Sequence, residues 1–321
     1  MLGSHLSIAG GMVNALRQAK RLRTDCVQVF TANQRQWRPT PPNEQQREEW
    51  LAELTAMGWD SISDGGPARV ISHNSYLINL ASPDATLWKR SLAAMRDEIE
   101  RCEALRVPLV VMHPGAHLGE PRTRGSANDL SGTISLDERA GIERIVRALD
   151  RIHADLPGYR TVACLETTVG SGTNLGYSFH HLAMIRGAVR ELQRIAFCFD
   201  TCHVTAAGYD MTTAGNAHAV MQQWDETCDI ENLRAFHFND SRGAVGSRLD
   251  RHAHIGDGCC NRACFRFLMN HAAFAFVPKI LETPKERDDH GREWDRVNLQ
   301  RLRRMVDKPA RAAQTASAAD R

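Results

Sequence analysis

The chain has 321 residues, of which 42% are hydrophobic, and its 40 basic and 38 acidic residues leave a net charge of +2. That length suits a single α/β barrel, and the near balance of charge neither supports nucleic-acid binding nor excludes it, because a local basic patch can steer DNA. No apolar run approaches the roughly 20 residues that a membrane helix needs, so no membrane partner is expected.

The cysteines indicate reduced thiols rather than disulfides. There are nine, an odd number; they are scattered, no CxxC pair occurs, and Cys259 and Cys260 are adjacent. The N-terminal MLGSHLSIAGG also lacks the charged and apolar regions of a signal peptide. We therefore expect a cytoplasmic protein.

Eight short apolar or β-rich runs alternate with helical segments along the chain. The predicted strands are 2–7, 26–32, 69–73, 108–113, 161–166, 195–200, 233–238 and 278–283. The clearest helical segments between and after them are 84–105, 137–154 and 295–306. Apolar strands that alternate with helices predict a parallel sheet covered on both faces, and eight such units favour a TIM (β/α)8 barrel over a doubly wound sheet.

Local signals support these boundaries. Ser82-Pro83-Asp84 predicts a cap and a first-turn proline at the start of the 84–105 helix, and Asp137 and Glu138 place negative charge in the first turn of the next helix. Residues 117–135 are rich in Gly and Ser and predict an extended loop. Residues 1–306 are expected to form one barrel domain, and the Ala-rich residues 307–321 a disordered tail.

Side chains that bind metals recur where the predicted strands end. In a barrel the C-terminal ends of all strands meet on one face, so these side chains are expected to converge there. The nine candidates are His73, His113, Glu166, Asp200, His203, His237, Asp250, His252 and Glu282. Nine ligands are too many for one four-coordinate ion and suit two or three divalent ions, which points to metal-assisted hydrolysis. Histidine and carboxylate without thiolate suit zinc, manganese or iron.

Some assignments stay open at this level. Asp250 and His252 alternate along an extended segment and can share an ion, but His254 has the same parity and is an equal rival. Glu166 and Glu282 lie on apolar strands, where either a metal or an Arg or Lys partner would offset the cost of burial. Cys202 is expected in the core.

Two loops are candidates for contact with a substrate. Residues 33–39, NQRQWRP, include Arg35 and could contact phosphate, or could be a solvated turn with one packed tryptophan. Residues 74–80, NSYLINL, follow His73, and Tyr76 and Leu77 there could insert between bases or begin a core helix.

The chain resembles the endonuclease IV family, metal-dependent apurinic/apyrimidinic endonucleases with a TIM-barrel fold. The resemblance runs in order over roughly residues 3–305, although Asn74 stands where many members have Asp. The matching stretches are GSHLSIAGG, FTANQRQW, HNSYLINLASP, HPGAH, LETTVGSGTNLG, FDTCHVTAAGYD, HFNDS, GSRLDRHAHIGDG and ILETP.

The resemblance implies three zinc ions, with Mn2+ or Fe2+ as alternatives at some positions. It implies that the first is held by His73, His113 and Glu166, the second by Glu166 as a bridge with Asp200, His237 and Glu282, and the third by His203, Asp250 and His252. This selects His252 over His254. It further implies that Arg35, Tyr76 and Leu77 enter the DNA at the lesion.

The activity that the resemblance implies is hydrolysis on the 5′ side of abasic sites in duplex DNA, leaving a 3′-hydroxyl and a 5′-deoxyribose phosphate, together with removal of damaged 3′ ends. Glu166 is expected to orient the nucleophile and Glu282 to help position it, in a monomeric enzyme. A metal-dependent sugar isomerase or epimerase of the same barrel type is the alternative enzyme. A metal-stabilised protein that only binds DNA lesions is the alternative outside enzymes.

Overall fold

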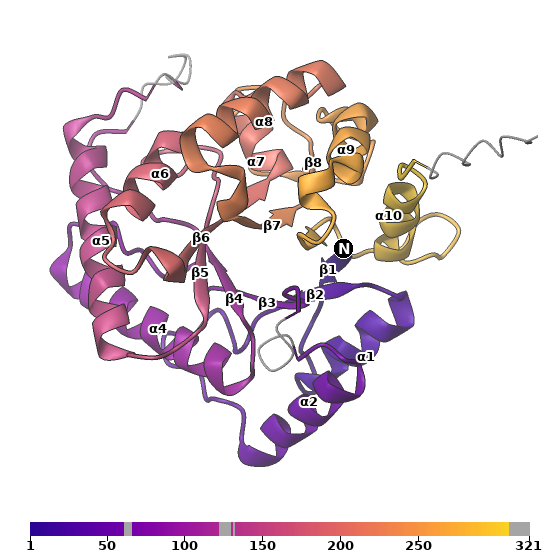
Figure 1. Cartoon of the computed structure of the whole chain (residues 1–321), viewed down its shortest axis with the longest axis horizontal. Coiled ribbons are helices and arrows are strands. Elements are labelled where there is room, and N and C mark those ends of the chain that lie inside the picture. The colour runs from indigo at the N-terminus through magenta and orange to yellow at the C-terminus, as the bar shows by residue number, and fades with distance from the viewer. Residues whose placement is uncertain (61–65, 122–129, 131, 308–321) are drawn as a thin grey trace, which may run out of the picture.

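The computed structural model of the chain describes residues 1–60, 66–121, 130 and 132–307. Its eight parallel strands close into a ring in the order β1-β10-β7-β6-β5-β4-β3-β2, with helices around it (Figure 1), which confirms the predicted TIM barrel. The strands are β1 Leu2–His5, β2 Cys26–Val29, β3 Val70–His73, β4 Leu109–Met112, β5 Val162–Glu166, β6 Ile195–Asp200, β7 Leu233–His237 and β10 Lys279–Leu281. Each lies within a predicted strand.

The helices that cover the barrel follow the strands along the chain. They are α1 Val13–Leu22, α2 Glu44–Ala56, α4 Ala85–Ala104, α5 Leu136–Asp155, α6 Phe179–Ala188, α7 Thr201–Ala207, α8 Ala214–Cys228, α9 Asn261–Asn270 and α10 Trp294–Arg303. Short 3-10 helices occupy Leu192–Arg194, Ile230–Asn232 and Ala272–Phe274. No helix in the described part of the chain is long and apolar enough to cross a membrane.

The helix starts follow from capping side chains. Asp84 is the N-cap of α4 and accepts a hydrogen bond from the Leu87 backbone N–H at 2.6 Å. Pro83 therefore precedes the cap, and the prediction that it lies in the first turn of the helix was wrong. Ser135 and Glu138 form a reciprocal capping box at the start of α5, and Asp137 and Glu138 lie in its first turn as predicted. The last residues of the predicted tail, 308–321, and residues 122–129 and 131 of the predicted long loop lie outside the described residues.

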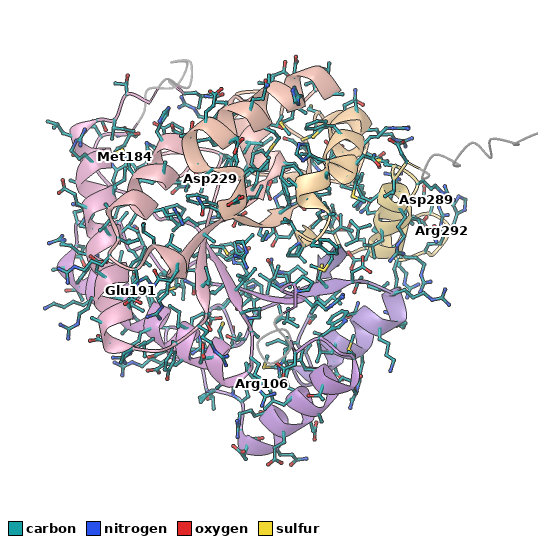
Figure 2. All side chains as sticks on the ribbon, viewed as in Figure 1. Arg106, Met184, Glu191, Asp229, Asp289 and Arg292 are labelled. Carbon is teal, nitrogen blue, oxygen red and sulfur yellow. The ribbon has the colours of Figure 1, made fainter. Side chains whose placement is uncertain are left out.

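Side chains fill the barrel interior and the space between strands and helices (Figure 2). Successive inward-facing side chains of a strand are two residues apart, so the interior is built in layers. One layer is small or apolar: Cys26, Ile71, Val111, Cys164, Cys198, Ala235 and Ile280. The positions two residues further along these seven segments, with His5 two residues after Gly3 on β1, lie at or beside the C-terminal ends of the strands: His5, Gln28, His73, His113, Glu166, Asp200, His237 and Glu282.

A small hairpin closes part of this end of the barrel. Strand β8, Asp240–Ser241, pairs antiparallel with β9, His252–Ala253, and places residue 252 beside residue 241. The hairpin was not among the strands that the sequence predicted. The Asp240 carboxylate holds the hairpin to the following turn, because it accepts backbone N–H groups from Gly256, Gly258 and Cys260 at 2.8, 3.1 and 2.9 Å.

The close approach of β1 to β2 requires a glycine at position 3. A Cβ there would lie 2.4 Å from the Cys26 carbonyl oxygen and 2.8 Å from its carbonyl carbon, which are backbone atoms that cannot move away alone. We expect Gly3→Ala to lower the free energy of unfolding by about 3 kcal/mol or more through overpacking. Gly187→Ala is the matched control, since no atom lies within 4 Å of its added Cβ. Urea unfolding should show the control unchanged or slightly stabilised; equal midpoints for both variants would contradict the steric argument.

Candidate metal centre

Glu166 is the centre of the polar layer. Its side chain is fully buried, and its Oε2 lies 3.2 Å from His73 Nε2 and 3.1 Å from His113 Nε2. Its other oxygen, Oε1, lies 2.8 Å from His237 Nδ1. The two oxygens of one carboxylate therefore face different histidines, an arrangement that suits a carboxylate shared between two cations.

A second group of ligand atoms lies on the Oε1 side of Glu166. His237 Nδ1 is 3.2 Å from Glu282 Oε2 and 3.8 Å from Asp200 Oδ2. Glu166, Asp200, His237 and Glu282 each offer one atom to a set in which all atoms lie within 4.8 Å of one another, and His73, His113 and Glu166 form another such set. These spacings fit ligands around a common ion.

A third group is built from α7 and the β8–β9 hairpin. His203 Nε2 and His252 Nε2 lie 3.3 and 3.6 Å from Asp250 Oδ1, and His252 Nε2 lies 3.8 Å from Asp200 Oδ2. His252 Nε2 is buried and has no hydrogen-bond partner among the described atoms, which is costly for a polar atom unless it binds something else. That orphaned nitrogen supports a cation at this position.

The hairpin decides between His252 and His254, which residue spacing had left as rival partners of Asp250. His252 faces Asp250 and Asp200, whereas the His254 ring stacks on Trp294 at a centroid distance of 3.6 Å, and its Nδ1 contacts Asn298 Nδ2 at 3.1 Å. The geometry therefore favours His252 as the partner of Asp250.

Most of these histidines are oriented by a hydrogen bond from their other ring nitrogen. Nδ1 of His73 donates to the Asn74 carbonyl at 2.8 Å and Nδ1 of His203 to the Thr167 carbonyl at 2.8 Å. Nδ1 of His252 donates to the Glu282 carbonyl at 3.1 Å. Each bond directs Nε2 at the cluster, and in a neutral ring, the form that binds a metal, it leaves the lone pair on Nε2.

The electrostatics of the cluster are those of a cation site. Burial alone would raise the pKa of Glu166, but His237 and His113 hold that pKa well below its ordinary value. Burial would lower the pKa of His203, yet Asp200 and Asp250 raise it well above its ordinary value. Within the described residues neither Glu166 nor Glu282 has a Lys or Arg partner in an ion pair, so the alternative of a basic partner is not supported.

Two amide side chains in contact with the cluster were missed from the sequence. Asn239 Nδ2 donates to Asp200 Oδ2 at 2.6 Å, and its Oδ1 accepts the Glu282 backbone N–H at 2.8 Å. Gln28 contacts His237 and Glu282 from β2. The position of Asn239 two residues after His237 offered a weak signal, whereas Gln28 could have been found only by placing β2 in the barrel and counting its inward positions.

Three further residues near the cluster are Cys202, His5 and His117. Cys202 is buried as predicted, and burial raises the pKa of its thiol to about 12. His5 lies beside the cluster, with its Nδ1 3.6 Å from Glu282 Oε1. His117 Nδ1 accepts a hydrogen bond from the Gly119 backbone N–H at 3.2 Å.

The two candidate recognition loops border the cluster and contact each other. Tyr76 is 64% exposed, yet its ring centroid lies 5.4 Å from that of His73 and 5.9 Å from that of His113. Leu77 is partly buried and lies in a turn, not at the start of a helix, and Arg35 is exposed. A cavity of about 240 Å³ opens beside His73, His113 and Tyr76.

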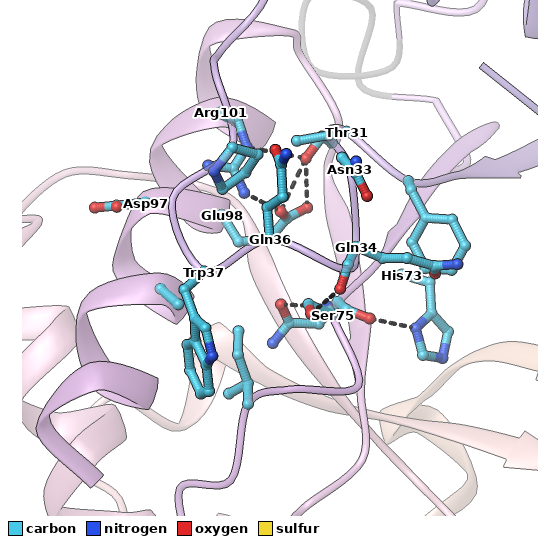
Figure 3. Close-up of a pocket in the computed structure, with 16 residues that line it drawn as sticks. Thr31, Asn33, Gln34, Gln36, Trp37, His73, Ser75, Asp97, Glu98 and Arg101 are labelled. Carbon is cyan, nitrogen blue, oxygen red and sulfur yellow. Dashed lines mark hydrogen bonds and ion pairs between the residues drawn. The ribbon is translucent and has the colours of Figure 1, made fainter. Parts of the chain in front are cut away.

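A network of polar side chains holds the loops 33–39 and 74–80 in place. Ser75 Oγ donates to the Gln34 carbonyl at 2.6 Å and so joins the second loop to the first (Figure 3). The buried Glu98 accepts hydrogen bonds from Thr31 and Arg101 (Figure 3) and also from Ser72. These contacts join the loop that carries Arg35 to the loop that carries Tyr76, whose ring lies beside those of His73 and His113.

Trp37 is the packed tryptophan of the first loop. The Arg90 guanidinium of α4 lies over its ring, 4.3 Å from the centroid. That part of the solvated-turn alternative is correct, while Arg35 remains exposed and available.

Comparison with known proteins agrees with this geometry. A family model described as a xylose isomerase-like TIM barrel matches residues 16–305. The probable endonuclease 4 of Geobacter sulfurreducens is 44% identical over 309 residues, which cover 95% of this chain and 94% of that protein. The crystal structure of endonuclease IV from Thermus thermophilus superposes with a TM-score of 0.75 at 31% identity, covering 95% of this chain and 98% of that one.

Solved structures of sugar epimerases share only the fold. A D-tagatose 3-epimerase-like protein superposes with a TM-score of 0.60, but at 18% identity, over 95% of this chain and 96% of that one. The barrel alone therefore does not distinguish the two kinds of enzyme, and the side chains must.

The central position of Glu166 generates a prediction about metal content. We expect Glu166→Gln to lose at least one equivalent of zinc per chain, because the neutral amide offers only one good acceptor oxygen where two groups of histidines converge. Metal analysis after dialysis measures the loss. Glu98→Gln is the control, since Glu98 is also a buried carboxylate but contacts Thr31, Ser72 and Arg101 instead of the cluster. An unchanged zinc content per chain in Glu166→Gln would contradict the bridging role of Glu166.

Proposed function

The chain belongs to the endonuclease IV family of xylose isomerase-like TIM barrels, and from that premise we propose that it hydrolyses the phosphodiester on the 5′ side of abasic sites in duplex DNA. The products are a 3′-hydroxyl and a 5′-deoxyribose phosphate, and damaged 3′ ends are a second substrate. The proposal includes a monomeric, cytoplasmic enzyme.

The observation that carries the proposal is the division of the Glu166 carboxylate between two sets of histidines, His73 and His113 on Oε2 and His237 on Oε1. A site for a single ion has no need of this division. Together with the orphaned His252 Nε2, it supports three cation positions in one cluster.

Zinc suits these donors, which are imidazole nitrogens and carboxylate oxygens without a thiolate. One zinc would be held by His73, His113 and Glu166 and a second by Glu166, Asp200, His237 and Glu282. A third would be held by His203, Asp250 and His252, since both histidines face Asp250 Oδ1 as well as lying in one group with Asp200. When bound, such ions supply Lewis acidity, which makes a nucleophile available from water at neutral pH and stabilises negative charge on phosphate.

The protein's own residues position this chemistry. Glu166 sets the separation of the two histidine groups and orients the nucleophile between them, and Glu282 Oε2 lies 3.2 Å from His237 Nδ1, where it helps to position the same nucleophile. Asp200 contributes to two groups at once, because it lies near both His237 and His252. Asn239 keeps the carboxylates of Asp200 and Glu282 in place by donating to both, at 2.6 and 3.4 Å.

Selectivity for the lesion comes from the loops at the edge of the cluster. An abasic nucleotide has no base to unstack, so its extrusion costs less than that of a normal nucleotide. Tyr76, Leu77 and Arg35 enter the gap and hold the kinked duplex. The exposure of Tyr76, beside the rings of His73 and His113, supports this role, since a side chain that only packed in the core would be covered.

A sugar isomerase or epimerase explains the site less well. A free sugar needs one or two ions, whereas the ligand atoms here form three groups around Glu166 and Asp200. An exposed tyrosine and arginine at the rim have no evident role on a small sugar. A protein that only bound lesions would need every metal position closed to a nucleophile, and the half-exposed Asp250 side chain does not favour that.

The activity is tested with a duplex oligonucleotide that carries one tetrahydrofuran abasic analogue. This analogue cannot undergo β-elimination, so any cut is hydrolytic. We expect a single cut immediately 5′ of the analogue, abolished by prolonged chelation and restored by zinc. An intact strand with fully metallated protein would exclude the endonuclease and would direct assays to ketoses and aldoses.

The role of the wedge is tested by Tyr76→Ala. We expect its affinity for lesion DNA to fall by roughly ten-fold, consistent with the loss of one stacking side chain, while zinc content stays that of the parent. Phe276→Ala is the matched control, because Phe276 is 75% exposed but lies just before β10, at the opposite end of the barrel. Fluorescence anisotropy measures binding; equal affinity in Tyr76→Ala and the parent would exclude the wedge.

A further inference from the structure

Gln28 is the uncharged amide in the inward layer that carries the cluster. It is fully buried on β2, in register with His5 of β1. Its position is far from the ligands in sequence, since His237 and Glu282 lie 209 and 254 residues further along. Closure of the barrel brings it against them.

Three contacts use the whole amide of Gln28. Its Nε2 donates to Glu282 Oε1 at 2.6 Å and lies 3.0 Å from His5 Nδ1. Its Oε1 lies 2.8 Å from His237 Nε2. A buried amide left without partners costs free energy, so this full set of bonds fixes its orientation.

These contacts determine which nitrogen of His237 carries the proton. Glu282 Oε1 is a carboxylate oxygen, which accepts hydrogen bonds, and it lies 2.6 Å from one end of the Gln28 amide. The Gln28 –NH₂ group must therefore face Glu282, and its carbonyl must face His237. An amide carbonyl also only accepts, so His237 Nε2 carries a proton, and Nδ1 is the nitrogen directed at Glu166 and Glu282.

We propose that Gln28 is a positioning residue of the metal centre, which fixes His237 with Nδ1 directed at the cluster and occupies Glu282 Oε1 so that Oε2 is left for the metal. The inference rests on the proposed metal-binding roles of His237 and Glu282. It is particular to this histidine: His73, His203 and His252 are oriented by backbone carbonyls, which no substitution removes, whereas His237 is held by a side chain.

The test compares Gln28→Leu, Gln28→Glu and the parent as full-length proteins. Leu keeps the approximate volume but neither accepts nor donates. Glu keeps an acceptor for His237 and replaces the donor to Glu282 by a second carboxylate. Thr161→Val is the control, because its buried hydroxyl, at the start of β5 and the opposite end of the barrel, bonds Glu103 and the Val107 carbonyl.

The first readout is zinc bound per chain at graded free zinc, set by a competing chelator and measured by metal analysis. Loss of an outer partner of a metal-ligating histidine weakens affinity about 10–100-fold. We expect that loss for one zinc in Gln28→Leu, with the remaining zinc and the Thr161→Val control at parental affinity. Parental affinity for every zinc in Gln28→Leu would overturn the proposal.

The second readout is the protonation of His237, followed by NMR of ¹⁵N-histidine-labelled protein and assigned by the signal missing in His237→Gln. We expect a proton on Nε2 in the parent and in Gln28→Glu, and a mixture of tautomers in Gln28→Leu. The same single tautomer in Gln28→Leu would overturn the role of the amide. A parent that binds no zinc would overturn both the inference and the proposed function, whereas a parent that binds zinc as expected but leaves the abasic duplex intact would contradict the proposed function alone.

Discussion

The structure depends on how three carboxylates are accommodated at the end of the barrel interior, the buried Glu166 and Asp200 and the partly buried Glu282. Charges in such a place are tolerated only when they are paired, and among the described residues their ionic partners are histidines. Imidazole compensates a carboxylate only while it is protonated. A divalent cation between the two groups satisfies both at once, with neutral imidazole and ionised carboxylate, so this end of the barrel has the composition of a metal site and not that of a packed core.

Some polar side chains around this cluster have two roles, because they hold local secondary structure and also position the cluster. Asp200 ends β6 and is also the N-cap of α7, where its Oδ1 accepts the His203 backbone N–H at 2.8 Å, while its Oδ2 faces His237 and His252. The cap thus orients the carboxylate and begins the helix that carries His203. Asp240 likewise gathers three backbone N–H groups around the hairpin that carries His252. Local secondary structure and the geometry of the cluster are set by the same atoms.

Much of this could be read from the sequence because a parallel barrel places every strand end on one face, so that His73, Glu166 and His237 needed only correct strand ends to be brought together. The β8–β9 hairpin could not be predicted, because two-residue strands leave no periodic pattern in the sequence. Without the hairpin, residue spacing could not decide between His252 and His254 as the partner of Asp250. Gln28 was missed for a different reason. An amide in an apolar strand carries no metal-ligand signal, and its partners are known only once the ring has closed.

That closure connects the metal centre to the fold. Gln28 belongs to the second strand, and Glu282 follows the last one, and they meet because β1 pairs with both β2 and β10. The ligands of the second group lie on or beside four consecutive neighbours in the ring, β5, β6, β7 and β10, so β1 is not needed to bring them together. Gln28 reaches His237 and Glu282 only because β1 joins β2 to β10. The pairing of β1 with β2 in turn requires Gly3, because Cys26 leaves no space for a side chain there. Gly3 offers no ligand atom, yet it permits the strand pairing that places Gln28 beside the ligands.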